Sequence, residues 1–181
     1  MKGIVFNLFS TIVIREHGED AWDDMLASTG LSGVYTSLGN YPDEELVKLV
    51  EAGRERLGMT DAGGLLRWFG RRATPILAQR YPAFFLPQKS TRQFLLTVNE
   101  IIHPEVQKIY PGADVPVFDF DASSDDVLVM GYRSRRKLCA LAQGFAEGAA
   151  DYYGEVVAIQ HAACMHDGAE RCVFNLRFSP A

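Results

Sequence analysis

The stretch from Phe94 to Pro116 constrains this chain most, because it combines a helical apolar pattern with a single histidine. At about 100° per residue, its apolar side chains fall on one broad arc, as in a helix that packs against a core. His103 lies inside the edge of that arc, where an imidazole must form a hydrogen bond, bind a metal or stay uncharged at a cost. A hydrogen-bonded residue at the edge of a core is the commoner outcome for a lone histidine, and a ligand is the alternative. The apolar set is Phe94, Leu95, Leu96, Val98, Ile101, Ile102, Val106, Ile109 and Tyr110.

The length and charge of the chain limit its class. Its 181 residues suffice for one ordinary domain, and we expect a single domain over 1–181. A helical N-terminal lobe would extend to about residue 85, and a C-terminal lobe would cover about 86–181. A hydrophobic content of 48% excludes a disordered protein, and a net charge of −5 without a long basic run argues against nucleic-acid binding. No apolar run is long enough to cross a membrane, so no membrane is expected as a partner.

The pattern of apolar residues predicts an α+β fold with helices first and an antiparallel sheet later. The C-terminal lobe would contain two long helices, the His103 helix and a second one that Ser134 caps. The type of the apolar segment 1–14 stays open, and the acidic segment 119–126 is interpreted as a solvated loop. The predicted helices are 20–28, one beginning at Pro42, 60–79, the His103 helix and 135–153, and the predicted strands are 127–132, 156–160 and 172–178.

Three polar side chains mark the junction between a predicted strand and a predicted helix. Tyr132, Ser134 and Arg136 are spaced two residues apart, so an extended or tightly turning backbone can direct all three toward one point. A guanidinium pairs bidentately with a carboxylate, and hydroxyls bond the remaining lone pairs, so the motif predicts an anion-binding site. The same residues are also compatible with a packed tyrosine, a capping serine and a solvated arginine.

These features together resemble the H-NOX family, the haem–nitric oxide/oxygen binding domains related to the sensor domain of soluble guanylate cyclase. The resemblance rests on the initial Met-Lys-Gly, on His103 with Pro116 downstream, and on Y-x-S-x-R at 132–136, and it covers essentially the whole chain. It implies a haem b between the two lobes, with His103 as the proximal iron ligand and the Y-x-S-x-R side chains on the propionates. Pro116 would press the macrocycle out of plane. Pro104, directly after the ligand, departs from the family pattern and could alter how freely the His103 helix moves.

The resemblance further implies a bacterial, cytoplasmic and non-enzymatic gas sensor. Nitric oxide on ferrous haem would weaken the bond between His103 and iron, and the two lobes would shift; carbon monoxide would also bind. Because the sequence shows no effector domain, the regulated protein would be a separate histidine kinase or cyclic-di-GMP enzyme. Such a change would be a two-state switch that the partner reads.

The choice of gas depends on the residues that the resemblance places on the distal side of the haem. Oxygen-binding family members carry a tyrosine five residues after the motif arginine, where this chain has Leu141. In an ungapped comparison, the places of their tryptophan and asparagine correspond to Phe9 and Ala73. None of these three side chains can donate a hydrogen bond to the charge that oxygen takes on at ferrous haem. We therefore expect binding of nitric oxide and carbon monoxide but no stable complex with oxygen.

A second group of residues has the composition of a zinc site. The three cysteines are an odd number, which argues against a disulfide framework and for a reducing cytoplasm or a metal site. Cys139, His161, Cys164 and Cys172 supply three thiolates and one imidazole, a complete set for closed, tetrahedral, structural zinc. Some bacterial H-NOX proteins carry zinc on this pattern, so the resemblance supports the assignment. Three free thiols near a hairpin, or a redox switch that releases the metal on oxidation, are the alternatives; His166 is an alternative ligand, although its His-Asp-Gly context is typical of a turn.

Two functions of other classes stay open on the sequence alone. One is a haem-free small-molecule binding module of the vinyl-reductase type, in which the C-terminal layout of helix, strands and cysteines is similar. The other is a zinc–thiol redox sensor in which His103 is only a core residue. A visible spectrum with a Soret band distinguishes both from a haem protein.

Overall fold

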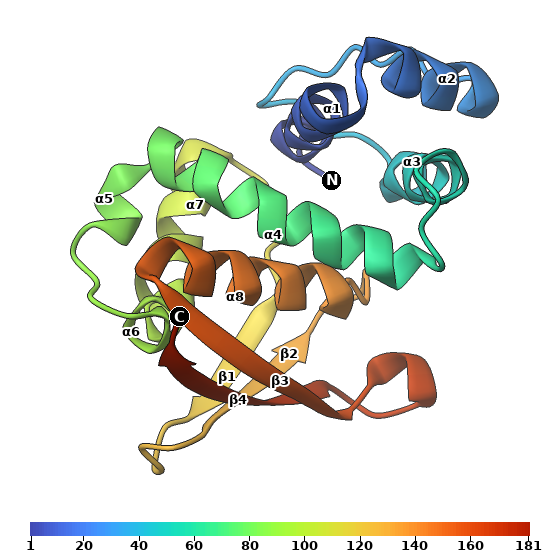
Figure 1. Cartoon of the computed structure of the whole chain (residues 1–181). Coiled ribbons are helices and arrows are strands. Elements are labelled where there is room, and N and C mark those ends of the chain that lie inside the picture. Colours follow the sequence, from blue (N-terminus) through green and yellow to red (C-terminus); the bar gives the residue numbers. More distant parts are fainter.

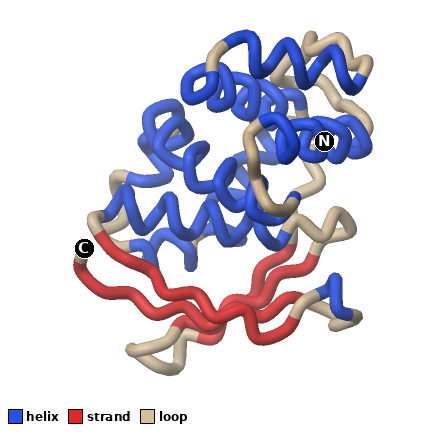
Figure 2. Tube along the Cα trace, turned by 45° about the vertical axis from the view of Figure 1, so that its right-hand side comes forward, coloured by secondary structure: helices blue, strands red, loops and turns tan.

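A four-stranded antiparallel sheet forms one side of the molecule, and helices cover one of its faces, in the computed structural model of residues 1–181 (Figures 1 and 2). Helix α8 packs between that face and α4, and the α+β class expected from the sequence is confirmed. None of the helices combines the length and the apolar character that a membrane span needs. In spatial order, the strands are β1 (Val117–Asp121), β2 (Leu128–Arg133), β4 (Cys172–Pro180) and β3 (Glu155–Ala163).

The helical part begins with the segment whose type the sequence left open, which forms α1. Charged side chains help to set the starts of later helices. Three acidic residues occupy the first turn of α3, and the Asp61 carboxylate caps α4 by accepting a hydrogen bond from the Gly64 amide at 2.7 Å. The helices are α1 (Gly3–His17), α2 (Glu19–Thr29), α3 (Asp43–Arg56), α4 (Ala62–Arg80), α5 (Pro82–Phe85), α6 (Thr91–Leu96), the π-helical turn η1 (Val98–Ile102), α7 (His103–Ile109), α8 (Cys139–Tyr153) and the 3-10 turn η2 (Met165–Asp167).

Helices α4 and α8 lie side by side at unusually short range (Figure 1). A Cβ on Gly144 would lie 2.0 Å from the Arg67 carbonyl oxygen, so only glycine permits this approach. Two bidentate ion pairs close the exposed side of the contact: Arg67 holds Glu147, and Arg71 holds Asp151 at 2.6 and 2.8 Å. The N-terminal and C-terminal halves of the chain therefore share one tightly packed pair of helices.

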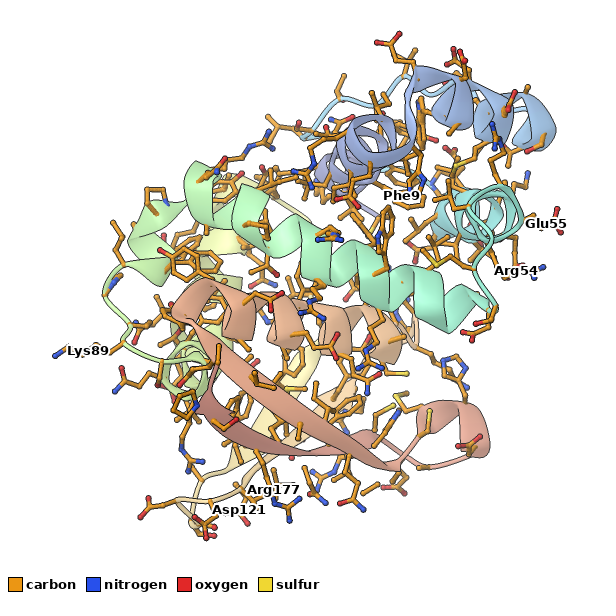
Figure 3. The ribbon with its side chains drawn as sticks, in the orientation of Figure 1. Phe9, Arg54, Glu55, Lys89, Asp121 and Arg177 are labelled. Carbon is orange, nitrogen blue, oxygen red and sulfur yellow. The ribbon has the colours of Figure 1, made fainter.

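Two hydrophobic cores lie on opposite sides of α8. The larger one joins α1–α4 and includes Phe9, which Figure 3 shows between α1 and α4, and Leu141 of α8. The smaller one lies on the sheet and takes Cys139 and Ala146 from α8. Because Leu141 follows Cys139 by only two residues, the helix turns one side to each core.

The start of α8 differs from the sequence prediction. A helix from Arg135 with Ser134 as its cap was expected, but α8 begins at Cys139 and no side chain caps it. The Lys137 amide instead donates to the Ser134 carbonyl at 3.1 Å, and Lys137 adopts φ 50, a conformation that interrupts a right-handed helix. The prediction was wrong because a tight turn, which leaves the neighbouring arginines free to reach other partners, replaces the first helical turn.

The segment expected to be an acidic loop is partly a strand. Residues Val117–Asp121 form β1, which pairs with β2 so that Phe118 lies opposite Tyr132. Its aromatic residues face the helices, and the carboxylates of Asp119 and Asp121 are exposed. The alternation of aromatic and acidic residues has the two-residue period of a half-buried strand, so the interpretation as a loop was wrong.

Candidate functional site

An apolar cavity of about 370 Å³ lies between the helical core and the sheet. Of the 34 residues that line it, 25 are hydrophobic. They come from α1 and α4 on one side, from α7 and α8, and from the inner face of β1 and β2. The lining is therefore contributed by segments from the first residues of the chain to residue 145, and it can accept a mostly apolar molecule.

His103 lines this cavity as the first residue of α7. Burial lowers the pKa of its imidazole to about 4, and no hydrogen bond or neighbouring charge opposes that shift. The nearest aromatic ring is that of Phe118, with 5.8 Å between ring centroids. The imidazole is therefore neutral near pH 7 and has a free ring nitrogen, which is the state in which histidine binds a metal. It is not the hydrogen-bonded histidine that the sequence left open as the commoner alternative.

The helix around His103 is broken into three segments rather than continuous. The segments are α6, the π-helical turn η1 and α7, and the His103 amide donates to the Val98 carbonyl five residues earlier. Pro104 accounts for this widened turn, because a proline has no amide hydrogen and its ring clashes with the carbonyl four residues before it, that of Glu100. Wide turns of this kind are rare and often occur at functional sites.

The three side chains of the Y-x-S-x-R motif all line the same cavity. Tyr132 is buried in β2, and burial raises the pKa of its phenol to about 12, so it stays protonated and can donate a hydrogen bond. The Ser134 hydroxyl accepts a hydrogen bond from the Arg136 amide at 3.3 Å. Nη1 of Arg136 donates to the Asp114 carbonyl at 2.8 Å and reaches its carboxylate at 3.1 Å. The structure thus brings the three predicted residues to one wall of the cavity.

One nitrogen of the Arg136 guanidinium, Nε, is buried and forms no hydrogen bond. This nitrogen lies 2.8 Å from the carboxylate of Asp43, but the N–H bond is not directed at that oxygen, so this buried donor lacks a hydrogen-bond partner. The same carboxylate accepts a hydrogen bond from the amino terminus of Met1 at 2.7 Å. A guanidinium at the cavity wall, with one nitrogen that is ion-paired but forms no hydrogen bond, suits a carboxylate ligand. The donor set therefore fits haem, an apolar macrocycle with two propionates and an iron that takes one imidazole.

The remaining predicted cavity residues fall into two groups. Pro116 and Leu141 line the cavity. Phe9 and Ala73 do not: both are completely buried in the helical core. The neighbour of Ala73, Thr74, lines the cavity in its place, and its hydroxyl donates to the Gly70 carbonyl at 3.1 Å. Sequence reasoning missed Thr74 because a shift of one residue rotates a side chain by about 100° around a helix.

The four residues predicted to bind zinc converge at the end of the sheet. The ligand atoms of Cys139, His161, Cys164 and Cys172 all lie within 4.8 Å of one another. The Cys164 sulfur is 4.0 Å from each of the other two, and none of the three cysteines forms a disulfide. Three sulfurs and one nitrogen at these separations match the ligand set of a closed tetrahedral site.

The surroundings of this thiol cluster affect both its ionisation and the choice of its histidine. Burial raises the pKa of Cys139 to about 12, so its thiolate needs a bound cation to be stable at neutral pH. The His161 ring stacks on Phe174 with 4.2 Å between ring centroids. The alternative ligand His166 lies elsewhere, since its Nε2 is hydrogen-bonded to the Lys137 carbonyl at 2.8 Å.

Known proteins match this chain over nearly its whole length. A model of the family described as Haem-NO-binding matches residues 2–161. A crystal structure of an H-NOX protein from S. oneidensis in the Fe(II)NO ligation state is 28% identical, superposes with a TM-score of 0.92, and covers 99% of both chains. The Fe(II) unliganded H-NOX protein from K. algicida is 25% identical over 100% of this chain and 98% of its own, with a TM-score of 0.88. The IWP-051-bound H-NOX from Shewanella woodyi in the Fe(II)CO state is 30% identical over 99% and 95%, with a TM-score of 0.84.

Proposed function

The chain belongs to the Haem-NO-binding, or H-NOX, family of haem-binding gas-sensor domains, and from this premise we propose that it senses nitric oxide and thereby regulates a separate signalling protein. Carbon monoxide is a second ligand in this proposal, which draws on the similar proteins whose structures hold Fe(II)NO and Fe(II)CO. The chain would act as one sensor domain over residues 1–181, with lobes at about 1–85 and 86–181, and would catalyse no reaction.

One observation carries the proposal: a neutral, unbonded imidazole lines a large apolar cavity that also contains an anion-binding motif. His103 supplies the imidazole, and burial keeps its pKa at about 4. A core histidine without a ligand would leave a polar group in an apolar space, which costs free energy unless something binds it. The rival haem-free binding module and thiol sensor give His103 no role that accounts for this cost.

Each group of residues has a separate task in the proposed sensor. When bound, haem supplies an iron that takes up the gas. His103 offers its ring nitrogen as the proximal ligand, and the surrounding apolar side chains exclude water. Tyr132, Ser134 and Arg136 would bind the propionates by donated hydrogen bonds, and Pro116, which also lines the cavity, would press on the macrocycle and distort it.

The response to nitric oxide depends on how firmly His103 is held. In the proposed mechanism, nitric oxide at the haem would weaken the hold of His103 on the iron, and α7, which begins at that residue, would be free to shift. The widened turn before His103 makes such a shift easier, because π-helical turns are less stable than α-helical ones. The lobes then adopt a second arrangement, which the partner recognises.

The partner and the compartment follow from the resemblance and from cysteine chemistry. We propose a histidine kinase or a cyclic-di-GMP enzyme as the regulated protein, in line with the bacterial family members that this sequence resembles. A cytoplasmic location is supported by the three cysteines, an odd number that fits a reducing compartment better than a disulfide framework.

We also propose that the thiol cluster binds one structural zinc ion. The support is its geometry, with four ligand atoms within 4.8 Å of one another and partly or fully buried thiols. Zinc would stabilise the thiolates that burial otherwise disfavours, and it would join α8 to the β3–β4 hairpin.

The visible spectrum of the purified protein tests the haem proposal. We expect a Soret band in the wild type, its loss in His103→Gly, and its recovery when imidazole is added to that variant. Addition of nitric oxide to the reduced protein should then replace the spectrum of histidine-bound iron with that of a nitric oxide complex in which this bond is weakened. A wild type that expresses well but takes up no haem, even when haem is supplied, contradicts the proposal.

A further inference from the structure

Asn99 forms two hydrogen bonds to the backbone of a single residue in another element. Its Nδ2 donates to the Phe118 carbonyl, and its Oδ1 accepts from the Phe118 amide at 3.3 Å. Asn99 belongs to the π-helical turn η1, and Phe118 belongs to β1, 19 residues later. One side chain thus joins the turn before His103 to the sheet.

The position of β1 in the sheet explains why this double contact is available. β1 is an edge strand that pairs only with β2, so every second residue directs its amide and carbonyl away from the sheet. A carboxamide carries one acceptor and two donor hydrogens, so Asn99 can satisfy both backbone groups of Phe118 as a neighbouring strand would. The edge strand is therefore closed by a side chain from the helical segment.

Phe118 in turn lies between two residues of the proposed haem site. Its ring centroid is 5.8 Å from that of His103 and 5.5 Å from that of Tyr132, which it contacts edge to face. All three side chains line the cavity. A displacement of Phe118 would therefore change the contacts both of the proposed iron ligand and of the tyrosine of the Y-x-S-x-R motif.

The turn that carries Asn99 needs an external anchor. Asn99 precedes His103 by four residues, a spacing that puts both side chains on one side of a helical segment. Pro104 removes one backbone donor from this segment, and η1 has the weaker bonding of a π-helix. The backbone alone therefore fixes the position of His103 along and around the helix axis less firmly than a regular α-helix would.

We propose that Asn99 is a positioning residue that, through Phe118, fixes the orientation of the His103 imidazole and couples its movement to β1. The inference rests on the proposed function in taking His103 as the haem ligand. A shift of the His103 turn would pull on the Phe118 backbone and so reach the sheet edge. This gives the release of His103 a direct path to the surface of the C-terminal lobe.

Two substitutions in the haem-loaded full-length protein test this inference. Asn99→Leu removes both hydrogen bonds, whereas Asn99→Asp keeps the shape and the acceptor but replaces the donor to the Phe118 carbonyl by a second acceptor. Glu100→Ala, on the same turn and exposed, is the matched control. The readouts are the iron–histidine stretching frequency by resonance Raman spectroscopy, the five- or six-coordinate character of the nitric oxide complex, and hydrogen exchange at the Phe118 amide.

We expect both Asn99 variants, but not Glu100→Ala, to shift the iron–histidine frequency and to change the share of five-coordinate nitric oxide complex. In Asn99→Leu, the Phe118 amide should exchange about two- to tenfold faster, as expected for the loss of one hydrogen bond. Unchanged spectra in both variants overturn the inference, even if exchange accelerates, since Asn99 would then hold only the strand. Unchanged exchange at Phe118 overturns it as well. A wild type without an iron–histidine signal contradicts the proposed function instead, and the exchange measurement still tests the contact.

Discussion

The cavity around His103 and the thiol cluster around Cys164 are two candidate metal sites in one chain with opposite construction. The cavity offers one nitrogen in an apolar space of about 370 Å³, whereas the cluster offers four ligand atoms within 4.8 Å of one another. A metal that has a single protein ligand can lose that ligand and still remain in the protein, provided that the rest of its cofactor stays bound. A metal held by four ligands has no exchangeable position. The cavity therefore suits a site that changes its coordination, and the thiol cluster suits a structural metal site.

Helix α8 connects the two sites while facing them with different residues. Cys139 belongs to the thiol cluster, and Leu141, two residues later, lines the cavity. Substitutions at one site should therefore leave metal binding at the other site intact.

The largest effect should follow from breaking the thiol cluster. Wild-type protein should contain about one zinc per chain, as a single tetrahedral site requires, and Cys164→Ala should contain almost none. The free energy of unfolding should fall by several kcal/mol, a part of the roughly 10–16 kcal/mol that structural zinc contributes in zinc-finger peptides. Metal analysis and thermal unfolding measure both effects. His166→Ala, outside the cluster, should keep its zinc, and the haem spectrum of the folded Cys164→Ala fraction should be normal; a fully stable wild type without metal contradicts the assignment.

A substitution between α4 and α8 should act on the cavity more than on the zinc site. In Gly144→Ala, the new methyl group would overlap the Arg67 carbonyl, so the two helices must separate, at a cost of about 1–3 kcal/mol or more. Haem content should fall, since Leu141 and Phe145 beside the substitution line the cavity, while zinc stays at about one per chain. The control is Gly64→Ala at an exposed position of α4, where the nearest atom is 3.7 Å away and stability should not fall. Equal loss of both metals would show that the two sites are not separable.

Removal of the motif arginine should weaken the cavity site specifically. Arg136→Ala loses a charge-assisted hydrogen bond of about 1.5–3 kcal/mol, and the carboxylates of Asp43 and Asp114 are left near the propionates, so haem should dissociate about ten- to a hundredfold faster. Transfer of haem to apomyoglobin measures this rate. Arg135→Ala is the matched control, because Arg135 also pairs with Asp114 but is exposed and lies outside the cavity lining. Equal rates in wild type and Arg136→Ala would remove the arginine from the site.

The smallest effect concerns the choice of gas. Leu141 cannot donate a hydrogen bond, and the Thr74 hydroxyl is already bonded to the Gly70 carbonyl, so neither residue offers a free donor to bound oxygen. The reduced wild type should form no stable complex in air. Leu141→Tyr should raise oxygen affinity by about tenfold, the lower end of what one donor to a charged ligand contributes. Leu141→Phe, equal in size but without the hydroxyl, should not. Spectra recorded in air decide this, and a stable oxygen complex of the wild type would contradict nitric oxide selectivity while leaving haem binding intact.

Local patterns in the sequence were sufficient for the fold class and for most elements. The strands at 156–160 and 172–178 alternate in the way that a half-buried sheet requires, and the helix that ends at Tyr153 has a regular apolar stripe. The signal for β1 was also present, as alternating Phe and Asp, but acidic residues are rare in strands and suggested a loop.

Other features depend on contacts that no local pattern encodes. A left-handed conformation such as that of Lys137 is uncommon for lysine, and it occurs in a turn whose Arg135 and Arg136 both pair with the Asp114 carboxylate. Thr74, and not Ala73, lines the cavity. Which of these neighbours faces the cavity depends on the rotation of α4 about its axis, and the packing of α4 on α8 sets that rotation. The contact between Asn99 and Phe118 joins segments whose pairing cannot be read from either one.

The α4–α8 pair also determines when during synthesis this protein can become functional. Its two ion pairs each join residues 80 positions apart, and the cavity behind them needs walls from α1 as well as from α8. A ribosome that has made only the first half of the chain has therefore produced an unfinished pocket with an exposed apolar surface. Contacts of such long range form late and slowly. A cofactor that needs all of these walls can thus be captured only after α8 has emerged from the ribosome.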